Sequence, residues 1–367
     1  MRFWGILLLL VFSILSCREP EEENPIIPIT PVDSFKVTPY NLVYPKWNSV
    51  IWLRLKIPAD NPLTVEGIAL GKKLFYDKRL SGNNSISCAS CHAPEHAFAD
   101  NKAFSSGING ALGDRNSMPL FNIAWADVLL PGNHKFFWDG RKASIEDQVL
   151  GPLGDPKEMD QNLAELVLKL NAIPEYPPLF KKAFGSDSIT MRLVMFAIAQ
   201  FERTLISSNS KFDKFKRGEV ELNASELNGL ELFSTEKADC FHCHGNEFNP
   251  LFTDFKYKNN GLDSIPIDKG LGNFTGKPED FGLFKTPSLR NLSFTAPYMH
   301  DGRFSTLEEV IEFYNSQTKD GATTDEVIRK HFPHGGLNLT ATEKQDLINF
   351  LRTLDDYEFV SNPNFRP

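Results

Sequence analysis

Positively charged residues are fewer than negatively charged ones in this sequence. The 367 residues include 39 lysines and arginines against 47 aspartates and glutamates, so the formal net charge at pH 7 is −8. A domain that binds nucleic acid usually carries a basic patch and an isoelectric point above about 9, whereas the isoelectric point of this chain is near 5.6. We therefore expect no nucleic-acid partner.

The N-terminus lacks an apolar run long enough to span a membrane. The run from Phe3 to Leu15 follows Arg2 and would rise only about 20 Å as a helix, short of the roughly 30 Å hydrocarbon core. It is typical of the apolar region of a signal peptide. Residues 14–17, ILSC, resemble the cleavage box of bacterial lipoproteins, which predicts a lipid on Cys17. An inert thiol in a discarded signal peptide is the alternative for this cysteine.

Low-complexity sequence is confined to the stretch that follows. After a signal peptide at residues 1–17, residues 18–49 are acidic and then proline-rich, which is typical of an extended tether. The remaining chain, in a sequence with 41% hydrophobic residues, can bury a core in two domains of common size. We expect the folded part to begin near residue 50.

Cysteine is rare, with five in the whole chain. Apart from Cys17, they occur in two C-x-x-C-H motifs at residues 88–92 and 240–244. This motif attaches c-type haem, because the thiols form thioethers and the histidine ligates iron. A four-cysteine zinc site, a redox dithiol and two disulfides are alternatives, but none of them needs a histidine after each second cysteine. The sequence predicts two covalently bound haem c groups, held by Cys88, Cys91, His92, Cys240, Cys243 and His244.

The two halves of the chain resemble each other beyond these motifs, which is the mark of an internal repeat. A segment rich in Leu and Phe precedes each motif, and we expect it to form a helix that packs on the porphyrin. Another pair of segments aligns Trp138 with His300. The matching segments are GKKLFYD (71–77) with GLELFST (229–235), AFAD (97–100) with LFTD (251–254), and FWDGRKASIEDQV (137–149) with MHDGRFSTLEEVI (299–311).

The repeat predicts the fold class. Strand signals are scarce, so we expect a mainly α protein with two tandem cytochrome c-like domains, one haem each and long loops. The domains are predicted at residues 50–208 and 209–367. Apolar residues at helical spacing predict a closing helix in each, over residues 191–207 and 339–354.

Together these segments resemble the bacterial di-haem cytochrome c peroxidase family, including its MauG branch. The resemblance runs from about Ile57 to Tyr357 and includes CASCH, FFWDGRKASIEDQVLGP and TAPYMHDGRF. It implies that the N-terminal haem reacts with hydrogen peroxide and that the C-terminal haem receives or stores electrons. It also implies a calcium ion between the domains, bound by Asn116, by the carbonyls of Thr295 and Pro297, and by water. A plain turn residue is the alternative for Asn116.

The sixth coordination position decides what each haem does, because a second strong ligand favours electron transfer and a vacancy admits peroxide. A capping box at Ser305 and Glu308 predicts a helix after His300, with Tyr314 on its inward face. The repeat aligns Tyr314 with Pro152 of the first half. Proline cannot ligate iron, whereas a tyrosine phenolate can.

Met299 is the alternative ligand of the second iron, because methionine commonly completes haem c. It aligns with Phe137, a packing position in the first half. A core tyrosine on an apolar helix face is the alternative for Tyr314. The resemblance favours ligation, since the family's sixth ligand lies 14 residues after the histidine at position 300, as methionine in many peroxidases and tyrosine in the MauG branch.

The resemblance also implies a glutamine and a glutamate over the open haem, at Gln148 and Glu158. Glu158 would move a proton between the peroxide oxygens, which suits a carboxylate in a dry pocket, and Gln148 would hydrogen-bond the bound oxygen species. Trp138 resembles the family's inter-haem tryptophan and would couple the two irons. The alternatives are a solvated charge for Glu158, an ordinary helix amide for Gln148 and a core aromatic for Trp138.

One position departs from the family pattern. Many di-haem peroxidases have a histidine 16 residues after the first haem histidine, where it blocks the peroxidatic iron until the other haem is reduced; here that residue is Ile108. His96 and His134 lie nearby in sequence and are expected to be structural or exposed. The sequence therefore predicts a first haem that is permanently open.

Three functions are consistent with these residues. The first is a peroxidase that reduces hydrogen peroxide to water with electrons from a small cytochrome c or cupredoxin. The second is a MauG-like enzyme that oxidises a protein substrate through a high-valent iron state. The third is a non-enzymatic electron carrier, which would have no use for an iron with a free coordination position.

We expect a periplasmic or cell-envelope protein that touches the membrane through its N-terminal lipid only. The sequence does not decide whether the protein forms a homodimer.

Overall fold

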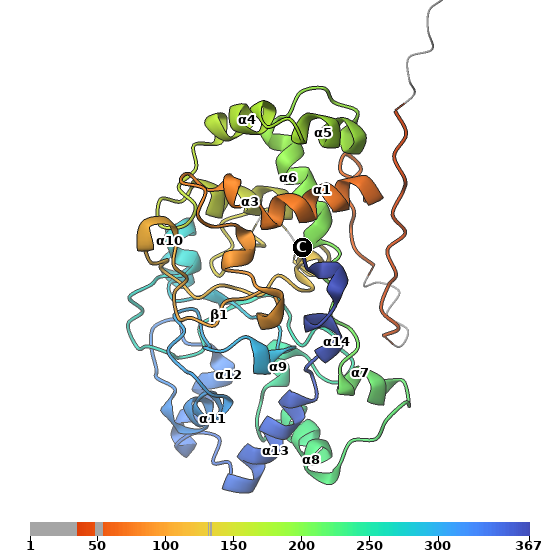
Figure 1. The fold of residues 1–367 in the computed structure, drawn as a ribbon. Helices are drawn as coiled ribbons and strands as arrows, with labels where there is room; N and C mark the ends of the chain where they lie inside the picture. Colours follow the sequence, from red (N-terminus) through yellow and green to blue (C-terminus); the bar gives the residue numbers. More distant parts are fainter. Residues whose placement is uncertain (1–34, 48–53, 131, 133) are drawn as a thin grey trace, which may run out of the picture. The chain divides into compact units, whose positions relative to one another are not determined.

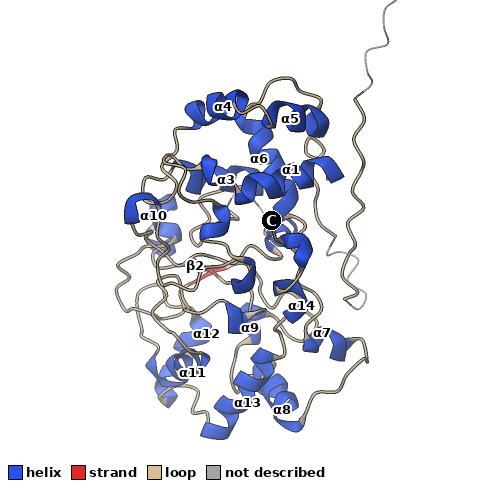
Figure 2. Cartoon of the chain, viewed as in Figure 1, coloured by secondary structure: helices blue, strands red, loops and turns tan. Residues whose placement is uncertain are grey.

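Helices make up most of the regular structure, and the strands are short (Figures 1 and 2). The computed structural model describes residues 35–47, 54–130, 132 and 134–367. Of these, Lys36–Pro367 belong to one compact unit. The predicted signal peptide and Cys17 lie outside the described residues. No helix within the described ranges has both the length and the hydrophobicity to cross a membrane.

The described elements confirm a mainly α fold with long loops and little strand. Strands β1 (Tyr257–Lys258) and β2 (Phe284–Lys285) pair antiparallel, with Tyr257 opposite Lys285. The division into domains at residue 208 stays a prediction. The α-helices are α1 (Val65–Tyr76), α2 (Ala126–Leu129), α3 (Ile145–Gly154), α4 (Leu163–Ala172), α5 (Tyr176–Phe184), α6 (Met191–Glu202), α7 (Lys211–Lys216), α8 (Ala224–Phe233), α9 (Phe241–His244), α10 (Leu271–Thr275), α11 (Leu307–Glu312), α12 (Glu326–Arg329), α13 (Ala341–Arg352) and α14 (Tyr357–Val360).

Two helix pairs repeat along the chain, α1 packed on α6 and α8 packed on α13 (Figure 1). A glycine permits the close approach in each pair. A Cβ atom on Gly71 would lie 1.8 Å from the carbonyl oxygen of Ala197, and one on Gly229 would lie 2.0 Å from that of Asp346. No side chain fits at either crossing, so both pairs depend on glycine. Gly71 and Gly229 begin the matching segments GKKLFYD and GLELFST.

Side-chain caps fix where these helices begin. The hydroxyls of Thr190 and Thr340 accept hydrogen bonds from backbone N–H groups in the first turns of α6 and α13. The two closing helices are therefore where the sequence predicted them, but they end earlier, at Glu202 and Arg352.

The predicted capping box before α11 is wrong by one residue. The Thr306 hydroxyl accepts from the N–H of Glu309, and the Glu309 carboxylate accepts from the N–H of Thr306 at 3.0 Å and of Ser305 at 2.6 Å. Both Ser305-x-x-Glu308 and Thr306-x-x-Glu309 match the pattern. The structure uses the second, and Leu307 and Ile311 of the helix that follows are buried.

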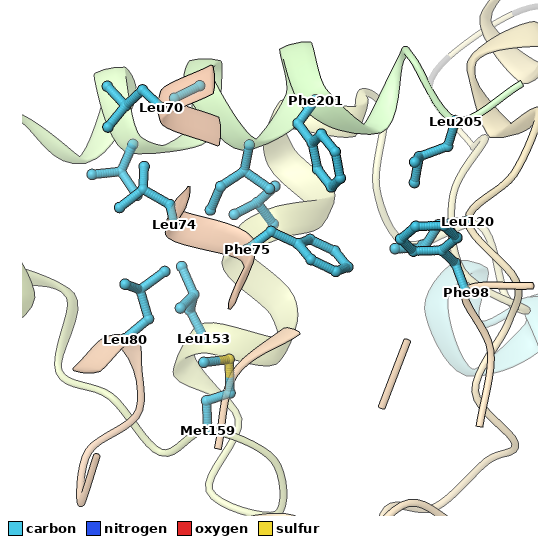
Figure 3. Close-up of a cluster of buried hydrophobic side chains, with 14 of the residues drawn as sticks. Leu70, Leu74, Phe75, Leu80, Phe98, Leu120, Leu153, Met159, Phe201 and Leu205 are labelled. Atoms are coloured by element: carbon cyan, nitrogen blue, oxygen red, sulfur yellow. The ribbon is translucent and has the colours of Figure 1, made fainter. Parts of the chain in front are cut away.

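Each of the two helix pairs contributes to a hydrophobic cluster of its own. The first contains Leu74 and Phe75 of α1 and Phe201 of α6, with Phe98 from the loop after the first motif (Figure 3). The second gathers residues of α8 and α13 with others from α7 and α11. Phe359 of α14 joins the first cluster, so the end of the chain returns to the N-terminal core.

The repeat is visible in the backbone as well as in the sequence. Isolated β-bridges join Phe136 with Lys142 and Tyr298 with Phe304. Inside these bridges, Phe137 and Met299 both adopt positive φ, at 66° and 73°. Positive φ is unusual for such side chains, so its occurrence at aligned positions indicates that both halves build the same turn before the helix that follows.

Candidate functional site

Each C-x-x-C-H motif borders its own cavity. The cysteines and histidine of residues 88–92 border a first cavity of about 40 Å³. Those of residues 240–244 border a second cavity of about 230 Å³. The thiols of the motif cysteines are free, and within the described chain the cysteines do not gather into one metal cluster. Because each motif borders a cavity of its own, the arrangement agrees with one group bound at each motif and argues against a shared four-cysteine zinc site.

Backbone carbonyls orient both motif histidines. Nδ1 of His92 lies 2.9 Å from the carbonyl oxygen of Phe98, and Nδ1 of His244 lies 3.1 Å from that of Phe252. Because Nδ1 donates to a carbonyl, Nε2 keeps its lone pair for a metal. Burial lowers the pKa of both imidazoles, that of His244 to about 4, so both are neutral as a ligand must be. The residues present therefore fit haem iron.

The first cavity combines an acid–base group with an amide. Gln148, Pro152 and Glu158 all border it, together with His92. Gln148 and Pro152 come from α3, and Glu158 follows the helix in the turn after it. Burial, with a smaller contribution from the charge of Asp155, raises the pKa of Glu158 to about 6. This carboxyl group can therefore exchange a proton near neutral pH.

Ile108 lies in a loop that packs beside Glu158. Ile108 is buried, and its N–H donates to the carbonyl oxygen of Glu158 at 2.9 Å. A Cβ atom on Gly107 would lie 2.0 Å from the carbonyl oxygen of Lys157, which shows how closely the loop packs. His96 and His134 do not border the first cavity. The loop thus presents no imidazole to this cavity.

Tyr314 and Met299 border the second cavity together with His244. The side chain of Asn260 lies between them, with Nδ2 donating to the Tyr314 hydroxyl at 3.0 Å and lying 3.6 Å from Met299 Sδ. The two candidate ligands therefore occupy one region of the cavity wall. Asn260 was not identified from the sequence, because nothing in its loop distinguishes it from a turn residue.

The backbone around Tyr314 differs from that of an ordinary helix. α11 ends at Glu312, and Phe313–Gln317 form a π-helical turn that contains Tyr314. π-Helical turns are frequent at functional sites. Burial raises the pKa of Tyr314 to about 12, so without a metal the phenol is neutral. Its aligned counterpart Pro152 lies inside α3 and offers no ligand atom.

Trp138 connects the second cavity to the N-terminal half. It is 8% exposed, borders the second cavity, and its indole N–H donates to the carbonyl oxygen of Asn116 at 2.8 Å. Its own carbonyl accepts from the N–H of Lys285 of β2 at 2.9 Å. Trp138 is therefore held by contacts from both halves, although it does not border the first cavity.

The residues expected to bind calcium all line the second cavity. Asn116, Thr295 and Pro297 all border it. Nδ2 of Asn116 donates to the carbonyl oxygen of Lys102 at 2.9 Å, which leaves the amide oxygen available to a cation. The backbone N–H of Asn116 donates to the carbonyl oxygen of His300 at 2.7 Å. The arrangement is compatible with the calcium site, which stays a prediction.

A second carboxylic acid in the first cavity was also missed. Glu202, at the end of α6, borders this cavity, is 4% exposed, and its Oε2 has no hydrogen-bond partner. Burial raises the pKa of Glu202 to about 8, so it is largely protonated at neutral pH. The helical pattern of residues 191–207 marks a closing helix but does not show that its last turn faces the cavity.

Comparisons with known proteins extend over most of the chain. A family model described as di-haem cytochrome c peroxidase matches residues 65–221. Cytochrome-c peroxidase IdrP1 of Pseudomonas sp. (strain SCT) is 36% identical over 338 residues, which covers 81% of this chain and 83% of that protein. Methylamine utilization protein MauG of Methylophilus methylotrophus is 36% identical over 304 residues, which covers 81% of this chain and 85% of that one.

A solved structure shares the fold. A MauG-like protein associated with microbial copper homeostasis superposes with a TM-score of 0.78 at 36% identity, over 89% of this chain and 98% of that chain. Because the superposition covers 89% of this chain, the similarity extends into both of its halves.

Proposed function

Because the chain belongs to the di-haem cytochrome c peroxidase family, we propose that it reduces hydrogen peroxide to water with two covalently bound haem c groups. Cys88 and Cys91 would hold the first haem and Cys240 and Cys243 the second. Haem iron supplies the redox chemistry when bound. The reaction takes up two electrons and two protons for each peroxide and releases two water molecules.

The observation that carries the proposal is the contrast between the two cavities. The second cavity is lined by Tyr314, whereas the first is lined by Pro152 together with Glu158 and Gln148. Proline leaves a place for peroxide, and a carboxyl group with a pKa near 6 can take a proton from one peroxide oxygen and return it to the other. Gln148 would orient the peroxide by a hydrogen bond.

The second cavity is proposed to hold the haem that relays electrons. Tyr314 is its proposed sixth ligand, and the N–H of Asn260 would stabilise the phenolate oxygen. Trp138 is proposed to couple the two haems, because it is buried and held by Asn116 and Lys285. The electron donor is proposed to be a small cytochrome c or cupredoxin.

A MauG-like oxidation of a protein substrate is the second candidate. Two observations favour it: the ligand position carries Tyr314, and proteins named MauG or MauG-like are as similar to this chain as a named peroxidase is. Both candidates use the same two cavities. They differ in whether electrons come from a small redox protein or from a protein substrate.

A peroxidase assay separates these candidates. Purified holoprotein is mixed with hydrogen peroxide and a reduced small cytochrome c, and we expect two cytochromes to be oxidised for each peroxide consumed. Peroxide-dependent oxidation of a protein substrate, with no turnover of the cytochrome, would support the MauG-like candidate instead. If a protein with two haems consumes no peroxide, the electron-carrier hypothesis is the one that remains.

The haem content is tested independently of activity. Replacing Cys88 and Cys91 with alanine, or Cys240 and Cys243, should halve the pyridine haemochrome yield per chain relative to wild type. Stoichiometric zinc without haem in the wild-type protein would contradict the whole proposal.

A calcium ion is part of the same proposal. Asn116, Thr295 and Pro297 would bind the ion. Elemental analysis before and after chelation tests this, with one calcium per chain expected before treatment.

The cell-envelope location is also part of the proposal. Cys17 would carry the lipid of an exported protein. Globomycin should leave the full-length precursor in membranes, and unchanged processing would exclude the lipoprotein.

A further inference from the structure

Three potential metal ligands lie beside the second C-x-x-C-H motif, and the proposed peroxidase chemistry does not use them. They are Glu236, Asp239 and His242. Nε2 of His242 lies 3.1 Å from Glu236 Oε1 and 3.1 Å from Asp239 Oδ1. The three donor atoms all lie within 4.8 Å of one another. One ion placed among them would contact all three side chains.

Asp239 has an oxygen that the protein leaves unsatisfied. Nε2 of His242 carries at most one proton, and that nitrogen is hydrogen-bonded to Glu236 Oε1. Asp239 Oδ1 therefore makes no hydrogen bond, although Asp239 is only 7% exposed. A buried carboxylate oxygen without a donor loses its hydration and gains nothing in return. A cation shared with His242 would satisfy it.

The other oxygens of the two carboxylates are already engaged. Lys330 Nζ lies 2.5 Å from Glu236 Oε2 and 2.6 Å from Asp239 Oδ2, and His331 Nε2 lies 2.5 Å from Asp239 Oδ2. These contacts leave Oε1 and Oδ1 facing His242, as outer-shell partners orient ligands in metal sites. Two carboxylates against one lysine leave a net charge of −1, which favours a cation.

We propose that Glu236, Asp239 and His242 bind one divalent transition-metal ion, with Zn²⁺ as the reference ion. One imidazole nitrogen and two carboxylate oxygens form a zinc donor set, and water would complete a four-coordinate ion. Ligands about 2.0–2.1 Å from a tetrahedral ion lie about 3.3 Å apart, close to the 3.1 Å that separates His242 Nε2 from each of the two carboxylate oxygens. Calcium and magnesium fit less well because they prefer oxygen ligands alone.

Zinc titration of the intact protein tests this site. Holoprotein that has been treated with a chelator to remove exchangeable metal ions, and whose haem content has been measured by pyridine haemochrome, is titrated with Zn²⁺ by calorimetry at neutral pH. We expect one saturable site per chain. Loss of the imidazole in His242→Gln should weaken zinc binding more than tenfold while the haem content stays unchanged.

A second histidine provides the matched control. His334 is exposed and lies outside the cluster, so His334→Gln removes a surface imidazole without removing a proposed ligand. Wild-type affinity in His334→Gln supports the site. Equal weakening in both variants, or no saturable site in wild type, overturns the proposal. Because haem is counted separately, failure of this site is distinguishable from failure of the di-haem proposal.

Discussion

Glu158 shows how position sets the chemistry of one side chain. It is a carboxylic acid in the sequence stretch GDPKEMD, which alone suggests a solvated charge. In the structure it borders a cavity with Gln148 and Pro152, and burial raises its pKa to about 6. The same residue is thereby suited to exchange protons at physiological pH.

Replacing Glu158 with glutamine should slow peroxide turnover by about 10²–10⁴-fold, the range for loss of a general acid–base group. Both haem spectra should be unchanged, because Glu158 is not a ligand. Steady-state kinetics with a reduced cytochrome measures the effect. Turnover at the wild-type rate would remove Glu158 from the mechanism.

The pH dependence gives an independent test of the same residue. The ionised carboxylate is needed to accept the first proton, so kcat/KM should fall as the pH decreases below about 6, the pKa of Glu158. Asp155 contributes to the raised pKa of Glu158, and Asp155→Asn should therefore move the acid-side decrease of kcat/KM to lower pH. If the same decrease persists in Glu158→Gln, it belongs to another group.

Two neighbouring side chains, Tyr314 and Met299, are the candidates for the sixth ligand of the second iron. With Tyr314 bound, Tyr314→Met should raise the reduction potential of the second haem, because an anionic phenolate favours ferric iron and a thioether favours ferrous iron. Met299→Leu should leave its spectrum nearly unchanged, and serves as the control. Spectroelectrochemistry measures both variants. Loss of a near-infrared methionine-to-iron band in Met299→Leu, with no effect of Tyr314→Phe, would show that Met299 is the ligand.

At the scale of elements, each half contains a pair of helices that cross closely at a glycine. Gly71 in α1 and Gly229 in α8 lie against the carbonyl oxygens of Ala197 in α6 and Asp346 in α13. These crossings pack the closing helices against the helices that precede the motifs. The closing helix α6 also carries Glu202 into the first cavity.

Adding a methyl group at either crossing should therefore destabilise the fold. Alanine gains about 1 kcal/mol in helix propensity over glycine, but the added Cβ atoms would lie 1.8 and 2.0 Å from carbonyl oxygens. We expect Gly71→Ala and Gly229→Ala each to lower the free energy of unfolding by about 1–3 kcal/mol, as overpacked cores do. Urea unfolding of the holoprotein measures this.

Gly154 is the matched control, since apart from its chain neighbours and the backbone of its own helix no atom lies within 4 Å of the position that its Cβ would take. Gly154→Ala should be neutral or slightly stabilising. Equal effects at all three positions would mean that the helix crossings do not require glycine.

At the scale of the whole molecule, the sequence predicts what repeats and misses what tertiary structure brings together. The two motifs, the helix before each motif, the closing helices and the alignment of Pro152 with Tyr314 all follow from the repeat, because both halves use the same local pattern. Asn260 and Glu202 could not be predicted in this way. One comes from a loop without a distinctive pattern and the other from the last turn of a helix, and only the folded chain places them at the cavities.

The central claim is that the two haem cavities differ, with the first iron open and the second closed by a side chain. Cyanide binding to the oxidised holoprotein tests it most directly, because cyanide occupies ferric haem with a free sixth position. Titration followed in the Soret band should show one cyanide per chain, hence one for every two haems, and Tyr314→Phe should add a second site. Two sites in the wild-type protein, or none, would contradict the account.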